Sequence, residues 1–298
     1  MGVTRNCEQE ALRWLVAQHP WPNSTMYHYT TSRTALENIL VTRRMWATDL
    51  RAMNDTRELR HGHELLAQRM KVMTRKVAND AKASFLRTTF ELYRSLMAKH
   101  SIAFGISFSK RADLPHQWWD YASEGSGFAL EWSIDDQCPE IPLRMWVTYD
   151  LARQKYLLDG LMTFHLDWIG DAVAQGARTP ADAFSEAGLS LAKLVDVTVH
   201  TFKAAKWSPE SEFRFVYRFF EGYVPGNVAI KTRPAGNSQK RYIEADFGQV
   251  QLGRVIVGPM NDYDQTARWL RLLLDSNGYT GTMIAPSVVT AAELLRFR

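Results

Sequence analysis

The chain contains little cysteine, no long apolar run and no linker-like stretch. Its two cysteines, Cys7 and Cys138, lie far apart in 298 residues without neighbouring ligand-type residues, which excludes a disulfide-stapled fold and a cysteine-rich zinc site. No apolar run approaches the roughly 18 residues of a membrane span, and residues 1–10 carry charges where a secretory signal has an apolar core. We therefore expect a cytoplasmic protein without a membrane partner.

Neither sign of charge dominates. Lys and Arg number 36 against 32 Asp and Glu, and the net charge of +4 is scattered, which permits a nucleic-acid partner without favouring one. With 46% hydrophobic and 12% aromatic residues, the chain has ample material for a core. Since no internal repeat or Pro/Gly/Ser-rich linker divides it, we expect a single domain over residues 1–298.

Several familiar motifs are missing. There is no G-x-G-x-x-G after a strand, no G-x-x-x-x-G-K-[ST] and no G-x-S-x-G, so Rossmann, P-loop and nucleophile-elbow sites are excluded. His61 and His63 are two residues apart and do not share a helix face. A solvated helix surface is favoured for them over a metal site, and we expect no metal.

Periodicity predicts helices in blocks and strands in clusters. Helices are expected at 8–18, after Thr31 or Ser32, within about 60–100, over about 150–205 and at 262–274. Runs of β-forming residues predict strands at 25–30, 102–108, 127–132, 144–149, 213–219, 228–231, 241–245 and 254–258, with Ile284 in a last short strand. This order indicates an α+β fold in which the regions at about 60–100 and 150–205 are helical insertions.

Two polar clusters lie in the first quarter of the chain. In the strand Tyr27-His28-Tyr29-Thr30, alternation puts His28 and Thr30 on one face, which is either a polar site or a core position with a satisfied histidine. Further along, Asn54 or Asp55 can cap the long helix and Glu58 can complete a capping box.

Two more clusters follow later. The segment from Ser107 to Tyr121 includes Gln117-Trp118-Trp119, which is either a hydrophobic wedge or a flat surface for stacking a heterocycle. Glu210, Glu212 and Arg214 lie two apart at the start of a predicted strand and hence on one face. They form either a surface salt-bridge ladder or the lining of a cleft.

In this order the clusters resemble a bacterial family of unknown function that carries the number 2971. The matching pieces are Tyr27 to Thr30, Trp46-Ala47, Asn54-Asp55 with Glu58, Ser107 to Ser109, Gln117-Trp118 with Tyr121, Trp207 with Glu210, Glu212 and Arg214, and Ile256 to Pro259. Together they cover most of the chain and leave the two helical regions as variable additions.

The order of His28, Tyr121 and Glu212 resembles the His-Tyr-Glu arrangement of ADP-ribosyltransferases. The helix pattern Leu36-Glu-Asn-Ile39-Leu40 fits those enzymes, and Glu210 with Glu212 resembles the Glu-x-Glu of members that modify arginine. The segment before Tyr121 departs from their pattern, since Gln-Trp-Trp-Asp precedes the tyrosine. The resemblance implies a split β-sandwich of two small, mostly antiparallel sheets, with NAD as the substrate and no metal.

The resemblance also implies a role for each candidate residue. Glu212 would stabilise the oxocarbenium-like ribose, with Glu210 beside it, and the ring of Tyr121 or Trp118 would stack on nicotinamide. The other implied contacts to NAD are those of His28 with the adenosine ribose, Thr30 or Ser107 on the nicotinamide side, and Tyr29, Gln117 and Arg214.

The resemblance thus predicts an ADP-ribosyltransferase or NAD glycohydrolase, of the kind found among toxins and phage-defence effectors. The sequence does not identify the acceptor, which is expected to be a protein or a nucleic acid, and an antitoxin is a further expected partner. A second hypothesis is a catalytically silent module of the same fold that binds a nucleotide or partner. A third is a metal-dependent nuclease built on Asp55, Glu58 and Glu131, which the dispersion of these acids disfavours.

Overall fold

The protein is a mixed α/β structure. The computed structural model describes residues 6–19, 25–52, 56–133, 143–235 and 238–297. Within those ranges the chain forms ten α-helices and one open sheet of ten strands. None of the helices so described has the length and apolarity needed to cross a membrane.

The elements have the following bounds. The helices are α1 (Cys7–Ala17), α2 (Arg33–Thr42), α3 (Thr56–Lys76), α4 (Asp80–Leu92), α5 (Ala98–His100), α6 (Pro115–Tyr121), α7 (Leu151–Ala174), α8 (Pro180–Val199), α9 (Tyr263–Ser276) and α10 (Ala291–Leu295). The strands are β1 (Met26–Thr30), β2 (Arg44–Asp49), β3 (Ser101–Ser109), β4 (Phe128–Ser133), β5 (Arg144–Trp146), β6 (Glu212–Phe220), β7 (Lys231–Ala235), β8 (Ser238–Asp246), β9 (Gln251–Val257) and β10 (Met283–Pro286). Three short helical segments are η1 (Leu50–Ala52), η2 (Tyr93–Met97) and η3 (Ala205–Glu210).

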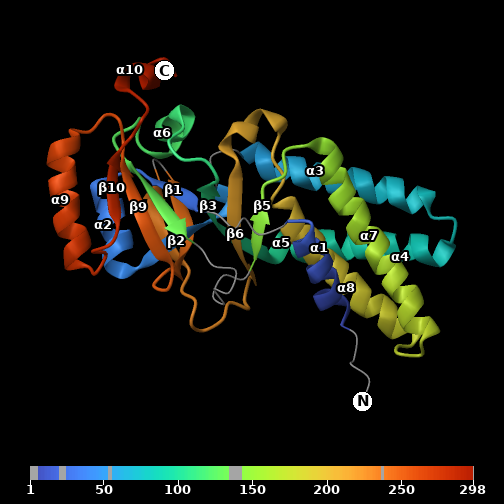
Figure 1. The fold of residues 1–298 in the computed structure, drawn as a ribbon. Helices are drawn as coiled ribbons and strands as arrows, with labels where there is room; N and C mark the ends of the chain where they lie inside the picture. Colours follow the sequence, from blue (N-terminus) through green and yellow to red (C-terminus); the bar gives the residue numbers. More distant parts are fainter. Residues whose placement is uncertain (1–5, 20–24, 53–55, 134–142, 236–237, 298) are drawn as a thin grey trace.

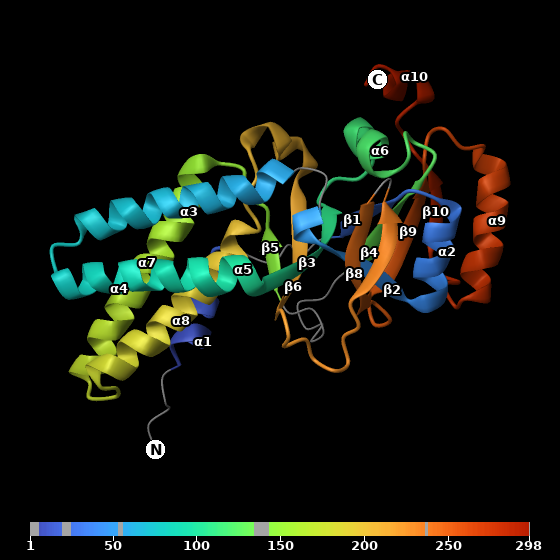
Figure 2. The ribbon, with the colours of Figure 1, turned by 180° about the vertical axis from the view of Figure 1, so that it is seen from behind.

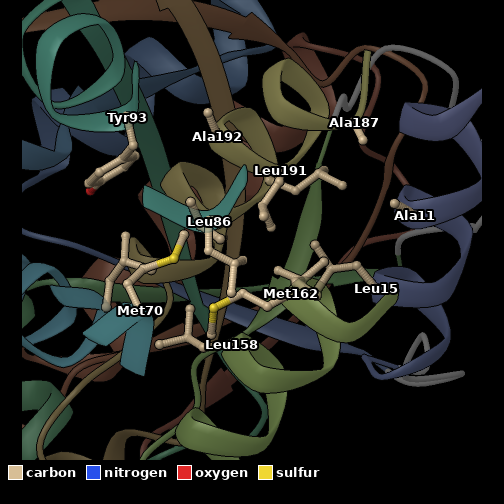
Figure 3. Packing of buried hydrophobic residues seen from close by; sticks show 14 of the residues in the cluster. Ala11, Leu15, Met70, Leu86, Tyr93, Leu158, Met162, Ala187, Leu191 and Ala192 are labelled. Carbon is tan, nitrogen blue, oxygen red and sulfur yellow. The ribbon is translucent and has the colours of Figure 1, made fainter. Parts of the chain in front are cut away.

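A helical block and a sheet region lie side by side. Helices α1, α3, α4, α7 and α8 gather beside β5 and β6, while α2 and α9 flank the opposite end of the sheet (Figures 1 and 2). The block has its own apolar core, in which Leu86, Leu158, Met162 and Leu191 interdigitate (Figure 3). A second core forms between the sheet and helices α2 and α9. The two helical insertions therefore fold together as one body against the edge of the sheet.

All ten strands of the described residues belong to one connected sheet, whereas the resemblance implies two small sheets. The order is β10-β9-β4-β1-β3-β2-β8-β7, and β6 pairs with both β3 and β5. Every pair is antiparallel except β9 with β10. Strand β3 has three strand neighbours, which means that two of them share one of its edges.

Most of the predicted elements are present, with local exceptions. The strand expected at 228–231 is misplaced, because β7 begins only at Lys231. Strand β2 and helices α6 and α10 have no counterpart in the prediction. His61 and His63 do not lie on a solvated surface: His61 Nε2 donates to Gln154 Oε1 at 2.8 Å, and the His63 ring contacts the Tyr93 hydroxyl.

Side-chain caps explain where the helices around the sheet begin. Ser32 Oγ accepts from the backbone N–H of Ala35 at 3.1 Å and starts α2 directly after β1. Thr179 caps α8 in the same way, with Pro180 in the first turn, where its missing N–H costs no helical hydrogen bond. The short strand, polar turn and helix expected from the sequence are therefore formed as β1, Ser32 and α2.

Gly127 provides a test of the packing that joins α6 to the sheet. A Cβ at this position would lie 2.1 Å from the Thr30 carbonyl oxygen and 3.0 Å from Ala122 Cα, and both are backbone atoms. We expect Gly127→Ala to lower the free energy of unfolding by about 3 kcal/mol in urea titrations. The control is Gly170→Ala, on an exposed position of α7 with open space around it, where alanine should add about 1 kcal/mol. Equal stability of the two variants would contradict the close approach.

Candidate functional site

The sheet forks at one edge of β3. Strand β6 pairs with β3 along its whole length from Ser101 to Ser109. The opposite edge is shared, because β1 joins it at Tyr27 opposite Ser109 and β2 joins it at Thr48 opposite Gly105. These two junctions are four residues apart along β3, about 13 Å at the usual rise of a strand. Between them β3 has no strand partner on this edge among the described residues.

A cavity of about 590 Å³ occupies the fork. Its floor is Gly105 to Ser109 of β3, and its walls come from β1, α2, α6, β2, η3, the start of β6 and the hairpin of β7 and β8. The volume lies in the range of small-molecule sites. Segments that are far apart in the sequence thus surround one space, and the missing strand partner on β3 creates it.

Eight of the ten candidate residues line this cavity. They are His28, Tyr29, Thr30, Ser107, Gln117, Tyr121, Glu210 and Glu212. Trp118 does not, which corrects its expected role in stacking nicotinamide: its indole is fully buried, packs edge-on against Tyr29 and donates from Nε1 to Asp113 at 2.6 Å. Arg214 also lies outside the lining and is only 1% exposed.

The two carboxylates reach the cavity by a route that differs from the prediction. Glu210 and Glu212 do not share a strand face, because Glu210 ends η3 and only Glu212 belongs to β6. Ser211 between them has a left-handed backbone with φ of 46° and reverses the chain. The carboxylates nevertheless converge, since Lys203 Nζ lies 2.6 Å from Glu210 Oε2 and 2.6 Å from Glu212 Oε2.

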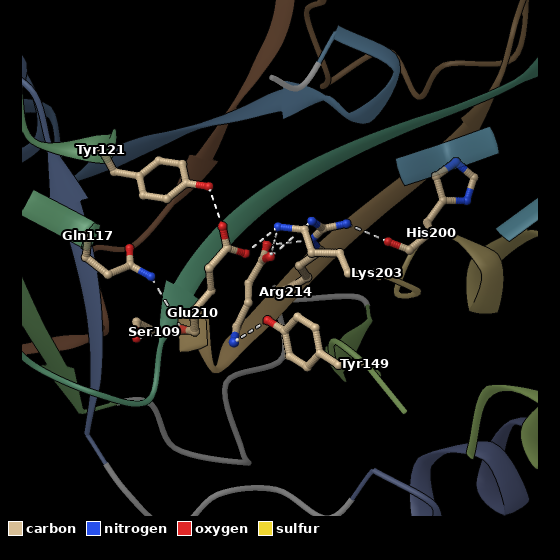
Figure 4. A network of polar contacts seen from close by, with 9 residues as sticks. Ser109, Gln117, Tyr121, Tyr149, His200, Lys203, Glu210 and Arg214 are labelled. Carbon is tan, nitrogen blue, oxygen red and sulfur yellow. Dashed lines mark hydrogen bonds and ion pairs between the residues drawn. The ribbon is translucent and has the colours of Figure 1, made fainter. Parts of the chain in front are cut away.

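Each carboxylate has a further fixed partner (Figure 4). The Tyr121 hydroxyl donates to Glu210 Oε1 at 2.7 Å, and Arg214 Nε donates to Glu212 Oε1 at 2.5 Å. Arg214 also donates from Nη2 to Glu212 Oε2 at 3.1 Å and from Nη1 to the His200 carbonyl at 2.7 Å. Arg214 therefore orients Glu212 from the side away from the cavity. It does not line the cavity itself, so the expected contact of Arg214 with a ligand is not supported.

The backbone around these carboxylates is held by neighbouring side chains (Figure 4). Ser109 Oγ and Gln117 Nε2 both donate to the Glu210 carbonyl, at 2.9 and 3.4 Å. The Tyr149 hydroxyl accepts from the Glu212 N–H at 3.0 Å. We call Tyr121, Lys203, Glu210 and Glu212 the carboxylate end of the cavity.

The electrostatics of the carboxylate end keep Glu212 ionised. Burial by itself raises the pKa of this carboxyl, but the charges and hydrogen bonds of Arg214 and Lys203 outweigh burial and lower the pKa from 4.5 to about 2. Burial and the neighbouring Glu210 charge raise the pKa of Tyr121 above its ordinary value, so its phenol is a neutral donor. The site thus combines a permanent negative charge with a fixed hydroxyl.

The side chain of His28, a residue of β1, reaches the part of the β3 edge that lies between the β1 and β2 junctions. Its Nδ1 is 3.0 Å from the Ser107 carbonyl oxygen, and because a carbonyl can only accept, Nδ1 carries the proton and Nε2 is left as an acceptor. Burial lowers the pKa of the imidazole, and the hydrogen bond to Ser107 opposes this only in part. Ser107 Oγ is buried without a hydrogen-bond partner within the described ranges, so a polar group for a ligand is present beside the ring.

Sequence reasoning missed Lys203, the cation between the two carboxylates. Its side chain is 6% exposed, and its backbone carbonyl accepts from Gln154 Nε2 of α7 at 2.9 Å. The sequence around it reads as a continuation of the second helical region, which ends at Val199 instead. No local pattern marks this lysine, because its role depends on the loop between α8 and η3.

The nuclease hypothesis has no support in the described residues. Asp55 and the side chain of Glu58 lie outside them, and Glu131 accepts from Arg254 Nε at 3.0 Å and from the Tyr27 hydroxyl at 2.9 Å. No group of three potential metal-ligating side chains is found in the part of the chain that the structure describes.

Comparisons with protein-family models, curated proteins and solved structures find no match for this chain. Its function must therefore be inferred from the site itself.

The depressed pKa of Glu212 gives a prediction for stability against pH. A carboxyl whose folded pKa lies below its unfolded value contributes stability above pH 4.5 and loses it as the pH falls toward 2. We expect Glu212→Gln to lower the free energy of unfolding by about 3–5 kcal/mol above pH 4.5, since Arg214 and Lys203 lose the Glu212 carboxylate and Lys203 keeps that of Glu210. The gap should close toward pH 2, where the protonated acid resembles glutamine.

Urea titrations at stepped pH measure this difference. Glu91→Gln is the control, because its exposed side chain on α4 pairs only loosely with Arg94 at 3.5 Å and should change stability by less than about 0.5 kcal/mol. A gap between Glu212→Gln and wild type that does not vary with pH would mean that Glu212 is not an ionised partner of Lys203 and Arg214.

Proposed function

We propose that this protein cleaves the bond between nicotinamide and ribose in NAD, as an ADP-ribosyltransferase or an NAD glycohydrolase. One observation carries the proposal. His28 and Glu212 are 184 positions apart in the sequence, and both line one cavity in the fork of the sheet together with Tyr121. Although the described strands form one connected sheet, β1 and β2 separate from the shared edge of β3, and this separation supports a relation to the split β-sandwich of ADP-ribosyltransferases.

The position of the shared motifs supports membership of the family numbered 2971. Several of the matching pieces line the same cavity, although they are dispersed along the sequence. They are Trp46, Ser107 to Ser109, Gln117, Tyr121, Glu210 and Glu212. The large helical regions that lie between the motifs pack beside the sheet and leave the fork open.

The chemistry of the bond cleavage fits the carboxylate end. When the C–N bond breaks, nicotinamide leaves with the bonding electrons and the ribose ring gains positive charge. Glu212, kept ionised by Arg214 and Lys203, stabilises that charge and accepts a hydrogen bond from the adjacent ribose hydroxyl. The ring of Tyr121 is fixed by its bond to Glu210 and offers a surface for nicotinamide. His28 Nε2 accepts from a ribose hydroxyl.

The second half of the reaction needs a base. The acceptor nucleophile, or water in a glycohydrolase, bonds to the ribose carbon and gives up a proton. Glu210 is placed for this role, because its carboxylate faces the cavity beside Glu212 and is 2.6 Å from Lys203. No covalent enzyme intermediate is needed.

One observation favours the second candidate, a silent binding module. Both carboxylates already bind Lys203, and Glu212 also binds Arg214 through both of its oxygens. Carboxylates neutralised in this way have less charge left for a developing cation. The same cavity would then hold a nucleotide without cleaving it.

Nicotinamide release separates the two candidates. We expect purified wild-type protein to release nicotinamide from NAD, measured by chromatography with and without cell lysate, and Glu212→Gln to release it roughly 100-fold more slowly. Tyr121→Phe should also slow release, because it removes the hydrogen bond to Glu210 Oε1 while keeping the aromatic ring. Glu64→Gln, on the exposed face of α3, is the control that should match wild type.

The folded state of each variant is checked by circular dichroism before the assay, since Glu212→Gln removes a buried anion. NAD binding by wild type without release of nicotinamide under either condition would discard the enzyme in favour of the silent module. Equal rates for wild type, folded Glu212→Gln and Tyr121→Phe would remove the carboxylate end from the mechanism.

A further inference from the structure

The wall of the cavity opposite β1 carries a group of side chains that the proposed chemistry does not use. Trp46 of β2, Arg233 of β7 and Lys240 of β8 all line the cavity there. We call these three residues the basic wall. The β2 junction at Gly105 and the pairing position of Glu212 at Ser109 are four residues apart on β3, about 13 Å, and the basic wall belongs to the β2 side of the fork.

Arg233 and Lys240 are directly opposite each other in the antiparallel pair of β7 and β8. Like charges at such positions repel and destabilise a hairpin. The pKa of Lys240 is lowered accordingly, by burial first and by the Arg233 charge second. Arg233 Nε is buried and has no hydrogen-bond partner among the residues that the structure describes. Both side chains of this like-charged pair line the cavity.

A neighbouring cation on the same face of the hairpin forms an ion pair that serves as a comparison. Lys231, two residues before Arg233, lies 2.8 Å from Glu244 Oε1, and the same carboxylate also binds Arg44 at 3.2 Å. Acidic partners therefore satisfy the cations at the outer end of the sheet, away from the cavity. Arg233 and Lys240, by comparison, line the cavity.

Trp46 supplies a flat surface next to this charge. Its indole is 38% exposed, lies 4.7 Å from the Tyr242 ring between centroids, and has the Arg233 guanidinium 5.4 Å from its own centroid. An exposed tryptophan with a cation beside it is a suitable surface for stacking a nucleobase. A guanidinium is also the group best suited to bind two phosphate oxygens at once.

We propose that the basic wall is a subsite for a nucleoside diphosphate, in which Arg233 and Lys240 bind the phosphates and Trp46 stacks on the base. This inference rests on the proposed function and extends it, because it assigns the adenosine diphosphate half of NAD to this wall and the nicotinamide half to the carboxylate end. His28 lies between the two and contacts a ribose.

The test is the binding of ADP, measured by calorimetry. Wild type is compared with Arg233→Gln and with Lys231→Gln, which removes the same charge from the same strand outside the cavity. We expect Arg233→Gln to weaken ADP binding roughly 10- to 100-fold, as loss of charge-assisted hydrogen bonds does, and Lys231→Gln to leave it unchanged. Trp46→Ala should weaken ADP but not pyrophosphate.

A charge reversal separates binding from folding. Arg233→Glu turns the repulsive pair with Lys240 into an attractive one, so its melting temperature should equal or exceed that of wild type while ADP binding is lost. A lower melting temperature with ADP affinity intact would assign Arg233 a structural role and overturn the subsite.

Other ligands decide the remaining outcomes. Absence of ADP binding to wild type overturns the proposal, and so does a single-stranded oligonucleotide that binds through Arg233 while ADP does not. ADP lacks the nicotinamide bond, so ADP binding that depends on Arg233 in a protein that releases no nicotinamide would reject the proposed function and keep the subsite. If the protein releases nicotinamide and Arg233→Gln leaves the KM for NAD unchanged, the proposed function is kept and the subsite is rejected.

Discussion

The shared edge of β3 is the constraint on which the rest of the site depends. An edge of nine residues cannot carry two full-length partners, so β1 pairs at the Ser109 end and β2 pairs in the middle of the strand, at Phe104 and Gly105. The backbone between them is left for a cavity, and the Ser107 carbonyl there is satisfied by the His28 ring instead of a strand. A sheet with one partner on that edge would be closed at this place.

The helical insertions help to hold the two cations that bind the acids of the carboxylate end. Burying Glu210 and Glu212 without partners would cost several kcal/mol each, and two cations offset this cost. Lys203 is held by Gln154 of α7, and Arg214 is oriented by the His200 carbonyl at the end of α8. Gln154 is bonded in turn to His61 of α3. The helical block therefore acts on the site through hydrogen bonds to Lys203 and Arg214.

Local sequence patterns predict the strands and helices around the fork better than they predict the fork. Alternation in Tyr27 to Thr30 places His28 correctly, and the capping signal at Ser32 places α2. The pairing of β1 and β2 with one edge of β3 depends on register between distant segments, which local strand propensity does not predict.

For the same reason no local pattern in the sequence marks Lys203, Arg233 and Lys240. Each of them acts only where its loop or hairpin meets the cavity. Strand spacing predicts that Glu210 and Glu212 share one face of a strand. In the structure the left-handed backbone of Ser211 and the Lys203 side chain bring the two carboxylates together. The aromatic ring of Trp118 suggests a stacking role, but the side chain is buried in the core.

The most direct measurement is a crystal structure of the protein with a non-cleavable NAD analogue. The nicotinamide ring should lie against Tyr121, with its ribose hydroxyl on Glu212, a ribose hydroxyl on His28 Nε2 and the diphosphate on Arg233 and Lys240. An analogue bound elsewhere on the molecule, or a cavity that stays empty at saturating analogue, would contradict the claim that the fork in the sheet is a dinucleotide site.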